Sequence, residues 1–146
     1  MYMLHSCRQA GLSAIVYERG GGVGGTWYWN RYPGARCDVP SLEYSYQFSE
    51  NLQQEWEWTE KYATQSEILR YAEHVADRFD LKRDIRFDAL VTSITYDETT
   101  NLWTTTLKDG EQTTSRFVVS AVGCLSSANR DVVCSPSLRV VVQRLV

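Results

Sequence analysis

The sequence of 146 residues lacks the features that mark several classes of protein. It has no apolar run of about 18 residues, the length that a membrane-spanning helix needs. Its first eight residues lack the order of a secretory signal. Basic residues form no cluster, and 15 Lys and Arg against 18 Asp and Glu give a net charge of -3 at pH 7. These absences predict a soluble, cytoplasmic protein with no membrane span and no nucleic-acid partner.

The sequence also lacks a pattern for metal binding or disulfide formation. Its four cysteines are far apart and show neither paired metal-ligand spacing nor a redox dithiol. They are Cys7, Cys37, Cys124 and Cys134. The two histidines, His5 and His74, are isolated from each other in sequence. We therefore expect reduced, packed thiols, structural or solvated imidazoles, and no metal site.

Aromatic residues, by contrast, are concentrated in one short stretch. Of the 18 Phe, Trp and Tyr residues, ten lie between Trp27 and Tyr62, including four of the five tryptophans. A length near that of one domain and a hydrophobic content of 43% predict a folded core. The aromatic stretch has no clear period, so we expect mostly irregular structure there and look for a reason for its composition.

The start of the chain predicts half of a βαβ unit. Residues 1–10 are typical of a helix end, and Gly11 follows in the position of a left-handed C-cap. Residues 13–18 form an apolar run that ends on the carboxylate of Glu18, as in a strand buried in a parallel sheet. Five glycines between Gly20 and Gly25 then predict a loop whose backbone another group can approach closely. The predicted fold class is α/β.

The most regular pattern in the chain begins at Thr64. Thr64-Gln65-Ser66-Glu67 is a capping box, which predicts a helix start. An apolar stripe at helical spacing follows this capping box. It comprises Ile68, Leu69, Ala72, Val75, Ala76 and Phe79. We therefore predict an amphipathic helix here.

Short stretches rich in β-branched and aromatic residues follow Leu81. They are residues 85–87, 90–96, 102–107 and 113–119. Turn signals at Asn101 and Asp109-Gly110 separate them, so we predict an antiparallel meander that leads into a buried strand over residues 117–123. Residues 130–146 have no capping signal and no clear period, and the apolar run 140–142 has no evident partner. We expect this tail to pack poorly.

Two features suggest chemistry, and each has a structural alternative. A carboxylate at a strand end, such as Glu18, accepts hydrogen bonds from ribose hydroxyls in dinucleotide-binding folds. The alternative is an acid that faces solvent. In residues 24–38, glycines admit a flat cofactor, tryptophans wall a planar ring, and Arg36 and Asp38 place opposite charges nearby. The alternative for this stretch is an aromatic core cluster under a long loop.

Residues 24–38 resemble the second signature of the flavin-dependent Baeyer–Villiger monooxygenases. The match comprises a small residue, Gly, any residue, Trp, four residues, an aromatic, Pro-Gly, three residues and Asp. The flanks are similar as well: Ile15-Val16-Tyr17-Glu18 before the signature and Ser41-Leu42-Glu43-Tyr44-Ser45-Tyr46 after it. Ala121-Val122-Gly123 stands where the family usually has Ala-Thr-Gly. The resemblance covers about residues 1–129.

The resemblance implies an FAD- and NADP(H)-dependent enzyme. Such an enzyme inserts one oxygen atom of O2 next to a ketone carbonyl through a flavin peroxide. Residues 1–129 would form part of an FAD-binding, Rossmann-like domain with an antiparallel meander. The cofactor-binding residues implied are Glu18, Gly24, Gly25, Thr26, Trp27, Tyr28, Trp29, Arg36, Cys37, Asp38, Tyr44 and Val91. Glu18 would hold the adenosine ribose and Val91 the adenine end.

The signature region would supply the remaining contacts. Residues 26–29 would line the flavin, Asp38 and Tyr44 would also touch FAD, and residues 36–38 would meet NADP. Asp38 is the implied catalytic residue, because its counterpart steadies an active-site arginine. That arginine has no match in this chain.

The chain also departs from the family. Three parts find no match: the first strand with its glycine-rich FAD loop, the NADPH-binding domain, and the first signature with its histidine. Residues 130–146 do not match the family and are consistent with a shifted reading frame. Two alternatives therefore stay open. One is a flavin monooxygenase that oxygenates nitrogen or sulfur, and the other is a truncated product with no activity of its own.

Overall fold

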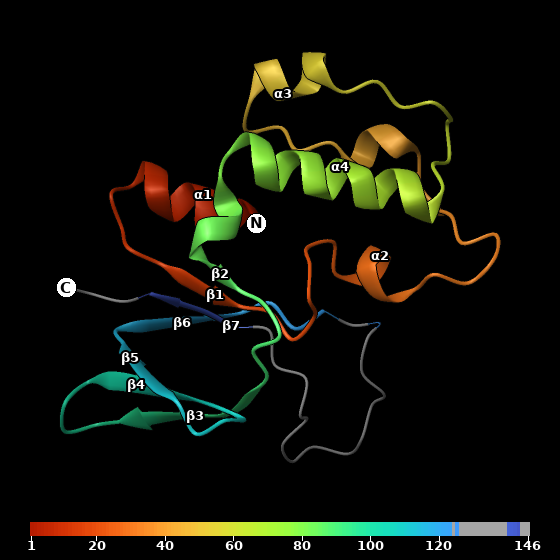
Figure 1. The fold of residues 1–146 in the computed structure, drawn as a ribbon. Coiled ribbons are helices and arrows are strands. Elements are labelled where there is room, and N and C mark those ends of the chain that lie inside the picture. Colours follow the sequence, from red (N-terminus) through yellow and green to blue (C-terminus); the bar gives the residue numbers. More distant parts are fainter. Residues whose placement is uncertain (124, 126–139, 144–146) are drawn as a thin grey trace. The chain divides into compact units, whose positions relative to one another are not determined.

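The computed structural model describes residues 1–123, 125 and 140–143, and the chain divides into two units (Figure 1). The first unit comprises Met1–Gly22 together with the chain from Asp80 onward, and the second comprises Val23–Phe79. No helix in the described part of the chain is long and apolar enough to cross a membrane. Cys124 and Cys134 lie outside the described residues, whereas Cys7 and Cys37 are free thiols.

The first unit contains two sheets. Its helical elements are α1 (Tyr2–Gln9) and η2 (Leu81–Asp84). One sheet has the strand order β2-β1-β7-β6, from β1 (Ile15–Tyr17), β2 (Ile85–Arg86), β6 (Phe117–Ser120) and β7 (Val140–Gln143). The other has the order β3-β4-β5, from β3 (Val91–Asp97), β4 (Leu102–Leu107) and β5 (Gln112–Ser115). The predicted helix end is confirmed, because Gly11 follows α1 with φ of 71°.

The three-stranded sheet confirms the antiparallel meander, with Asn101 and Gly110 at positive φ in its turns. Its inner face shares a buried cluster with β1, formed by Tyr17, Ala89, Val91 and Leu107. The Tyr17 hydroxyl is 2.7 Å from Oγ1 of Thr113 in β5. This bond satisfies the polar end of a side chain that is only 1% exposed.

The strand predictions need three corrections. Residues 85 and 86 do not belong to the meander but pair in parallel with Val16 and Tyr17. A run of two residues carries no signal for its partner, so the sequence could not assign it. The sheet around β1 is mixed, because β7 pairs with β1 antiparallel. The third correction concerns β6, which is not buried: Phe117 is 58% exposed, because β6 is the last strand in the order of its sheet.

The tail prediction also changes in part. Val140–Gln143 forms β7, which pairs antiparallel with both β1 and β6. The apolar run 140–142 therefore has two backbone partners, where we expected none. The signal was missed because both partners lie at least 20 residues away in sequence. Residues 130–139 and 144–146 lie outside the described residues.

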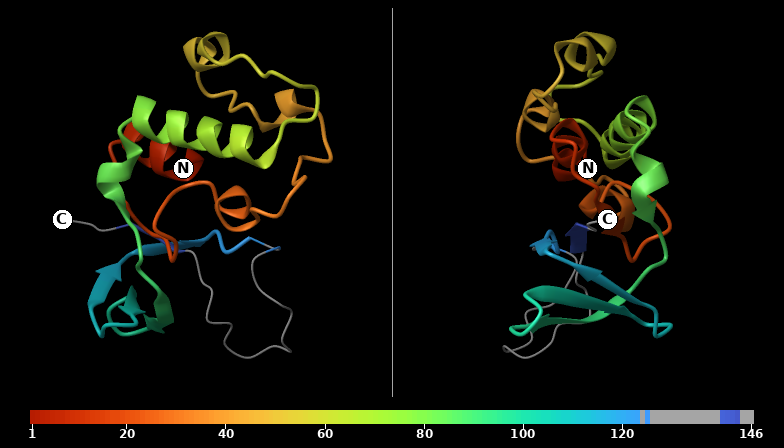
Figure 2. Two further views of the ribbon diagram at one scale, coloured as in Figure 1. Left: turned by 45° about the vertical axis from the view of Figure 1, so that its right-hand side comes forward. Right: turned by 90° about the vertical axis from the view of Figure 1, so that its left-hand side faces the viewer.

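The second unit is built around one long helix. Its elements are α2 (Thr26–Trp29), η1 (Ser41–Tyr44), α3 (Glu50–Glu55) and α4 (Gln65–Arg78). In both views of Figure 2, α4 runs between α3 and α2. The predicted helix is confirmed, and its N-cap is Thr64, whose hydroxyl accepts the N–H of Glu67 at 3.4 Å. Of its apolar stripe, Ile68, Ala72, Val75 and Ala76 are buried.

Much of the aromatic stretch packs on α4. One buried cluster joins Leu52 to Tyr71 and Val75, and a second joins Cys37, Ala63 and Ile68. The aromatic side chains packed against the first are Tyr46, Phe48, Trp56, Trp58 and Phe79, and those against the second are Trp27, Tyr44 and Trp58. Aromatic rings cover large areas, so few residues close this core. Much of the aromatic excess is therefore explained by packing.

The Tyr71 hydroxyl gives this core a testable polar bond. It accepts the backbone N–H of Tyr46 at 2.7 Å, and Tyr71 is 3% exposed. Tyr71→Phe keeps the ring and leaves that N–H without its acceptor, so we expect the free energy of unfolding to fall by about 1–3 kcal/mol. Urea unfolding of the purified chain measures this loss. Tyr46→Phe is the control, since it leaves the bond in place, and an equal loss in both variants would contradict the assignment.

Candidate functional site

Glu18 follows β1 directly, at the carboxyl end of a strand that is parallel to β2. Its backbone is held on both sides, because its N–H donates to Arg86 O at 2.9 Å and its carbonyl accepts the N–H of Ala89 at 3.0 Å. Its carboxylate accepts the N–H of Gly20 at 2.7 Å, and the residue is only 9% exposed. Glu18 is therefore not the solvent-facing acid of the structural alternative. The carboxyl ends of parallel strands are where open α/β sheets bind ligands.

The glycines before α2 have conformations that favour glycine. Gly24 has φ of 113°, and Gly25, the N-cap of α2, has φ of 58°. A Cβ built on Gly24 would lie 2.5 Å from Cδ1 of Leu69 in α4. The positive φ of Gly24 favours glycine by itself, and a side chain there would also displace the end of the Leu69 side chain, whether or not a cofactor approaches it.

Helix α2 carries the aromatic residues of the signature. Trp27 packs in the cluster of Cys37 and stands edge-on to the ring of Tyr44, with centroids 5.7 Å apart. Tyr28 and Trp29 are also edge-on, at 5.0 Å. Thr26 is the first residue of α2, and Trp29 is 41% exposed. Among the rings of α2, Trp27 therefore packs in the core, whereas Trp29 is partly exposed.

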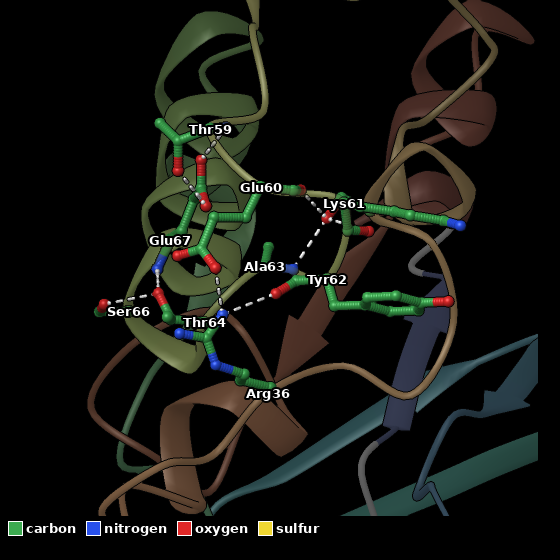
Figure 3. A network of polar contacts seen from close by, with 10 residues as sticks. Arg36, Thr59, Glu60, Lys61, Tyr62, Ala63, Thr64, Ser66 and Glu67 are labelled. Carbon is green, nitrogen blue, oxygen red and sulfur yellow. Dashed lines mark hydrogen bonds and ion pairs between the residues drawn. The ribbon is translucent and has the colours of Figure 1, made fainter.

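The turn from Arg36 to Asp38 is held by residues just before α4 (Figure 3). The Arg36 guanidinium donates to the Glu60 carboxylate, at 2.5 Å, and to the Tyr62 carbonyl, at 3.0 Å. The Cys37 N–H donates to Ala63 O at 3.1 Å, and the Cys37 side chain is 5% exposed. Asp38 is exposed. Among the residues described, the carboxylate of Asp38 has no ion pair, which leaves it free to meet a cation supplied from elsewhere.

Tyr44 completes this region from η1. Partial burial raises the pKa of its phenol, and the nearby Cys37 and Asp38 raise it further. Burial also raises the pKa of Tyr46 and Tyr71. The neutral phenol is therefore favoured in the folded state at all three positions.

These raised pKa values predict a loss of stability at alkaline pH. The stabilising contribution of each neutral phenol is complete below the unfolded pKa of about 10 and is lost as the pH rises through the higher folded pKa. We expect part of the tyrosine absorbance change at 295 nm to appear late and to coincide with unfolding. Uniform ionisation of all nine tyrosines near pH 10, with the fold intact, would contradict this.

Val91, the residue implied at the adenine end, lies at the start of β3 and pairs with Leu107. The whole residue, backbone included, is 0% exposed, so its contact with the adenine end stays a prediction from the resemblance. No group of three or more His, Cys, Asp and Glu residues that would hold a metal ion occurs in the part of the chain that the structure describes.

A cleft of about 640 Å³ lies elsewhere in the second unit. Its lining residues are Pro40, Ser41, Leu42, Gln53, Gln54, Trp56, Glu57, Trp58, Thr59, Glu60 and Lys61. None of the residues predicted to bind a cofactor lines it. The size of this cleft therefore gives no support to the predicted site, which rests on the side chains themselves.

The sequence was compared with known proteins, and its matches are monooxygenases. No family model matches the sequence. The chain is 44% identical to an acetone monooxygenase from Gordonia sp. (strain TY-5) and 37% identical to a cyclohexanone 1,2-monooxygenase from Acinetobacter sp. These matches cover 90% and 81% of this chain but 25% and 22% of the relatives. The chain is homologous to part of the Baeyer–Villiger monooxygenases.

Solved structures agree with this relationship. An oxidised steroid monooxygenase bound to NADP superposes with a TM-score of 0.85 at 58% identity, over 90% of this chain and 25% of that one. A cyclohexanone monooxygenase from Rhodococcus sp. Phi1 bound to NADP+ gives the same TM-score at 45% identity. The chain thus spans about a quarter of the length of these Baeyer–Villiger-type relatives.

The residues of this chain fit the flavin that such enzymes bind. Glu18 offers a preoriented carboxylate, which is the acceptor that ribose hydroxyls need. Trp29 offers a partly exposed ring beside a backbone with positive φ. The sequence did not predict the polar contacts of Ser41 and Glu67, two residues that are each 2% exposed. Their partners lie in irregular segments and are not neighbours in sequence, so no local sequence pattern predicts these contacts.

Proposed function

We propose that this chain supplies the flavin-binding part of an FAD- and NADPH-dependent monooxygenase. The enzyme would insert one oxygen atom of O2 next to a ketone carbonyl. The observation that carries the proposal is a complete second signature, residues 24–38, which includes α2 and packs against α4 in a chain homologous to these enzymes. Relatives that support the cofactors include a fungal FAD-binding monooxygenase and a structure in complex with FAD and NADP.

The four-stranded sheet would be the FAD-binding, Rossmann-like sheet. In that fold the strand order runs 3-2-1, and the acid that holds the ribose follows strand 2. β1 and β2 are adjacent and parallel, and Glu18 follows β1, so they correspond to strands 2 and 3. β7 lies on the other side of β1, where that order places strand 1, but it runs antiparallel to β1 and so does not correspond to strand 1 of that fold. Residues 1–129 would then form the FAD-binding portion, with 130–146 outside the family pattern.

In such an enzyme the site residues would have the following roles. Glu18 would accept hydrogen bonds from the adenosine ribose, and the backbone at Val91 would contact the adenine end. Gly24 and Gly25 would let the ring approach α2, whose residues Thr26, Trp27, Tyr28 and Trp29 would line it. Tyr44 would close the same wall through its contact with Trp27. An apolar wall also keeps water from the ring, and FAD reduced by NADPH would supply the oxygen-activating chemistry.

The turn of residues 36–38 would face NADP. Asp38 is exposed and carries a charge that is not neutralised by any ion pair in the described residues, so it would orient a cationic side chain of the active site. Arg36 is already engaged by Glu60 and Tyr62. We therefore assign Arg36 to holding the turn as well as meeting NADP.

A second candidate is oxygenation of nitrogen. The chain is 43% identical to a phenazine N-monooxygenase from Lysobacter antibioticus, against 44% for the acetone monooxygenase. A segment that binds the shared flavin is expected to be equally similar to both classes. Sequencing the gene on both sides of this reading frame would distinguish the two candidates. The presence of the first signature, with its histidine, would favour the Baeyer–Villiger reaction.

The isolated chain is expected to hold no flavin, because none of its residues matches the glycine-rich loop that binds the pyrophosphate. We expect the 146 residues to purify colourless and to show no NADPH oxidation. The visible spectrum after purification tests this expectation. A retained yellow flavin that NADPH bleaches would show that the chain is active by itself.

A chimera tests the proposed function. Residues 1–123 of this chain would replace the matching segment of the steroid monooxygenase that is 58% identical. We expect the purified chimera to be yellow and to be bleached by NADPH. The control is the same exchange with a second family segment, from the cyclohexanone monooxygenase at 45% identity. A folded, colourless chimera beside a yellow control would overturn the proposal.

A further inference from the structure

A short segment, residues 59–63, runs between the signature loop and the first turn of α4, and we call it the strap (Figure 3). Its position is set by two buried side chains rather than by its own secondary structure. Ser41 reaches it from the C-terminal side of the signature loop, and Glu67 reaches it from α4. Both residues are 2% exposed, so their hydrogen bonds to the strap are shielded from water and costly to leave unmade.

Ser41 makes the denser set of bonds. Its Oγ accepts the N–H of Ala63 at 2.8 Å. Its single hydroxyl proton is directed at two carbonyl oxygens, Glu60 O at 2.7 Å and Lys61 O at 3.0 Å. Its own N–H donates to Lys61 O at 2.8 Å. One serine therefore satisfies backbone groups of three strap residues. A buried hydroxyl can be satisfied with fewer hydrogen bonds than Ser41 makes.

Glu67 holds the beginning of the strap. Its two carboxylate oxygens accept the N–H and the hydroxyl of Thr59, at 2.8 Å and 2.9 Å. In a complete capping box this carboxylate would accept the N–H of Thr64, whereas here both of its oxygens accept from Thr59. The helix retains the half of the capping box made by the Thr64 hydroxyl. The Glu67 carboxylate binds the strap instead.

The strap in turn holds the residues that face the cofactors. The Cys37 N–H donates to Ala63 O, and Arg36 binds Glu60 and the carbonyl of Tyr62. Asp38 has no such bond of its own within the described residues, so its position depends on Cys37 before it and on Ser41 three residues after it. A shift of the strap would move both of these anchors.

We propose that Ser41 is a positioning residue for the turn of Arg36–Asp38, acting through a strap that Glu67 anchors to α4. This inference rests on the proposed function and assigns to that site a residue outside its ligand contacts. Loss of the Ser41 hydroxyl loosens the turn that meets NADP while leaving α2, and so the flavin wall, in place. Misplacement of a positioning element is costly for reactivity even when no ligand contact is removed.

The test compares Ser41→Ala with Ser49→Ala. Ser49 is a matched control, because its hydroxyl also accepts one backbone N–H in the same unit, that of Leu52 at the start of α3. In the 146-residue chain we expect hydrogen exchange at the Ala63 and Cys37 amides to rise about tenfold in Ser41→Ala and to stay unchanged in Ser49→Ala. Equal exchange in the two variants would overturn the proposal.

The functional arm uses the yellow chimera. We expect Ser41→Ala to raise KM for NADPH about tenfold with FAD content unchanged, and Ser49→Ala to leave both within twofold. An unchanged KM in Ser41→Ala overturns the positioning role while the chimera itself still supports the proposed function. If Ser41→Ala loses FAD, Glu67→Gln is the milder variant, since its oxygen still accepts the Thr59 N–H. A raised KM there supports the strap, and an unchanged KM overturns it.

Discussion

Replacing Glu67 by alanine is expected to lower the free energy of unfolding by about 3 kcal/mol. The change leaves the N–H and the hydroxyl of Thr59 without their acceptor in a place where the carboxylate is only 2% exposed. It also removes a negative charge from the first turn of α4, where the helix dipole favours one. Urea unfolding followed by circular dichroism measures the loss.

Glu73→Ala provides the control for this change. Glu73 is an exposed residue of the same helix, so the substitution has the same chemistry without the strap. We expect it to change the free energy of unfolding by less than about 0.5 kcal/mol. Similar losses in the two variants would mean that the bonds to Thr59 contribute nothing of their own.

Gly24→Ala is the second substitution with a large expected effect, a loss of about 2–4 kcal/mol. Alanine at φ of 113° is strained, and its Cβ would meet Leu69 Cδ1 at 2.5 Å and the Tyr28 N at 3.4 Å. Gly34→Ala separates the two causes, because Gly34 also has positive φ, 81°, but nothing within 4 Å. We expect that control to lose only the strain, about 1–2 kcal/mol.

The crowding at Gly24 also predicts a coupling. Leu69→Ala removes the nearest atom, so the double variant Gly24→Ala/Leu69→Ala should lose less stability than the sum of the two single variants. Urea unfolding of the parent, the two single variants and the double variant gives all four values. If the losses of the two single variants add up to the loss of the double variant, the strained backbone, and not contact with Leu69, is the reason that glycine is favoured at position 24.

Elements with local signals were predictable from the sequence. The capping box at Thr64 placed the start of α4, because an N-cap is made by residues within one turn. Gly11 likewise marked the end of α1. The signature loop was found through its spacing of Gly, Trp, Pro-Gly and Asp, which needs no knowledge of partners.

Contacts between distant segments were not predictable in the same way. The Glu67 carboxylate binds Thr59, which lies in a segment without periodicity. β2 pairs with β1 across nearly 70 residues, and two residues carry too little pattern to specify it. For the aromatic stretch, periodicity failed because its rings reach α4 from loops and not from one regular face. In the site, the residue types were predictable but not the hydrogen bonds of Arg36 and Cys37 to the strap.

The central claim is that residues of this chain hold the flavin. A yellow chimera alone does not isolate that contribution, because the rest of the enzyme also binds FAD. Glu18 does isolate it, since its carboxylate is preoriented by the Gly20 N–H at the end of β1. Glu18→Gln keeps an oxygen for that N–H and removes the charge, so the local structure is preserved.

The decisive measurement is the dissociation constant of FAD from the chimera carrying Glu18→Gln. We expect it to rise about tenfold or more relative to the parent chimera, because the bonds from ribose hydroxyls to a charged acceptor are weakened. Glu43→Gln, at an exposed position of η1, should leave it unchanged. An unchanged dissociation constant in a folded Glu18→Gln chimera would contradict the account.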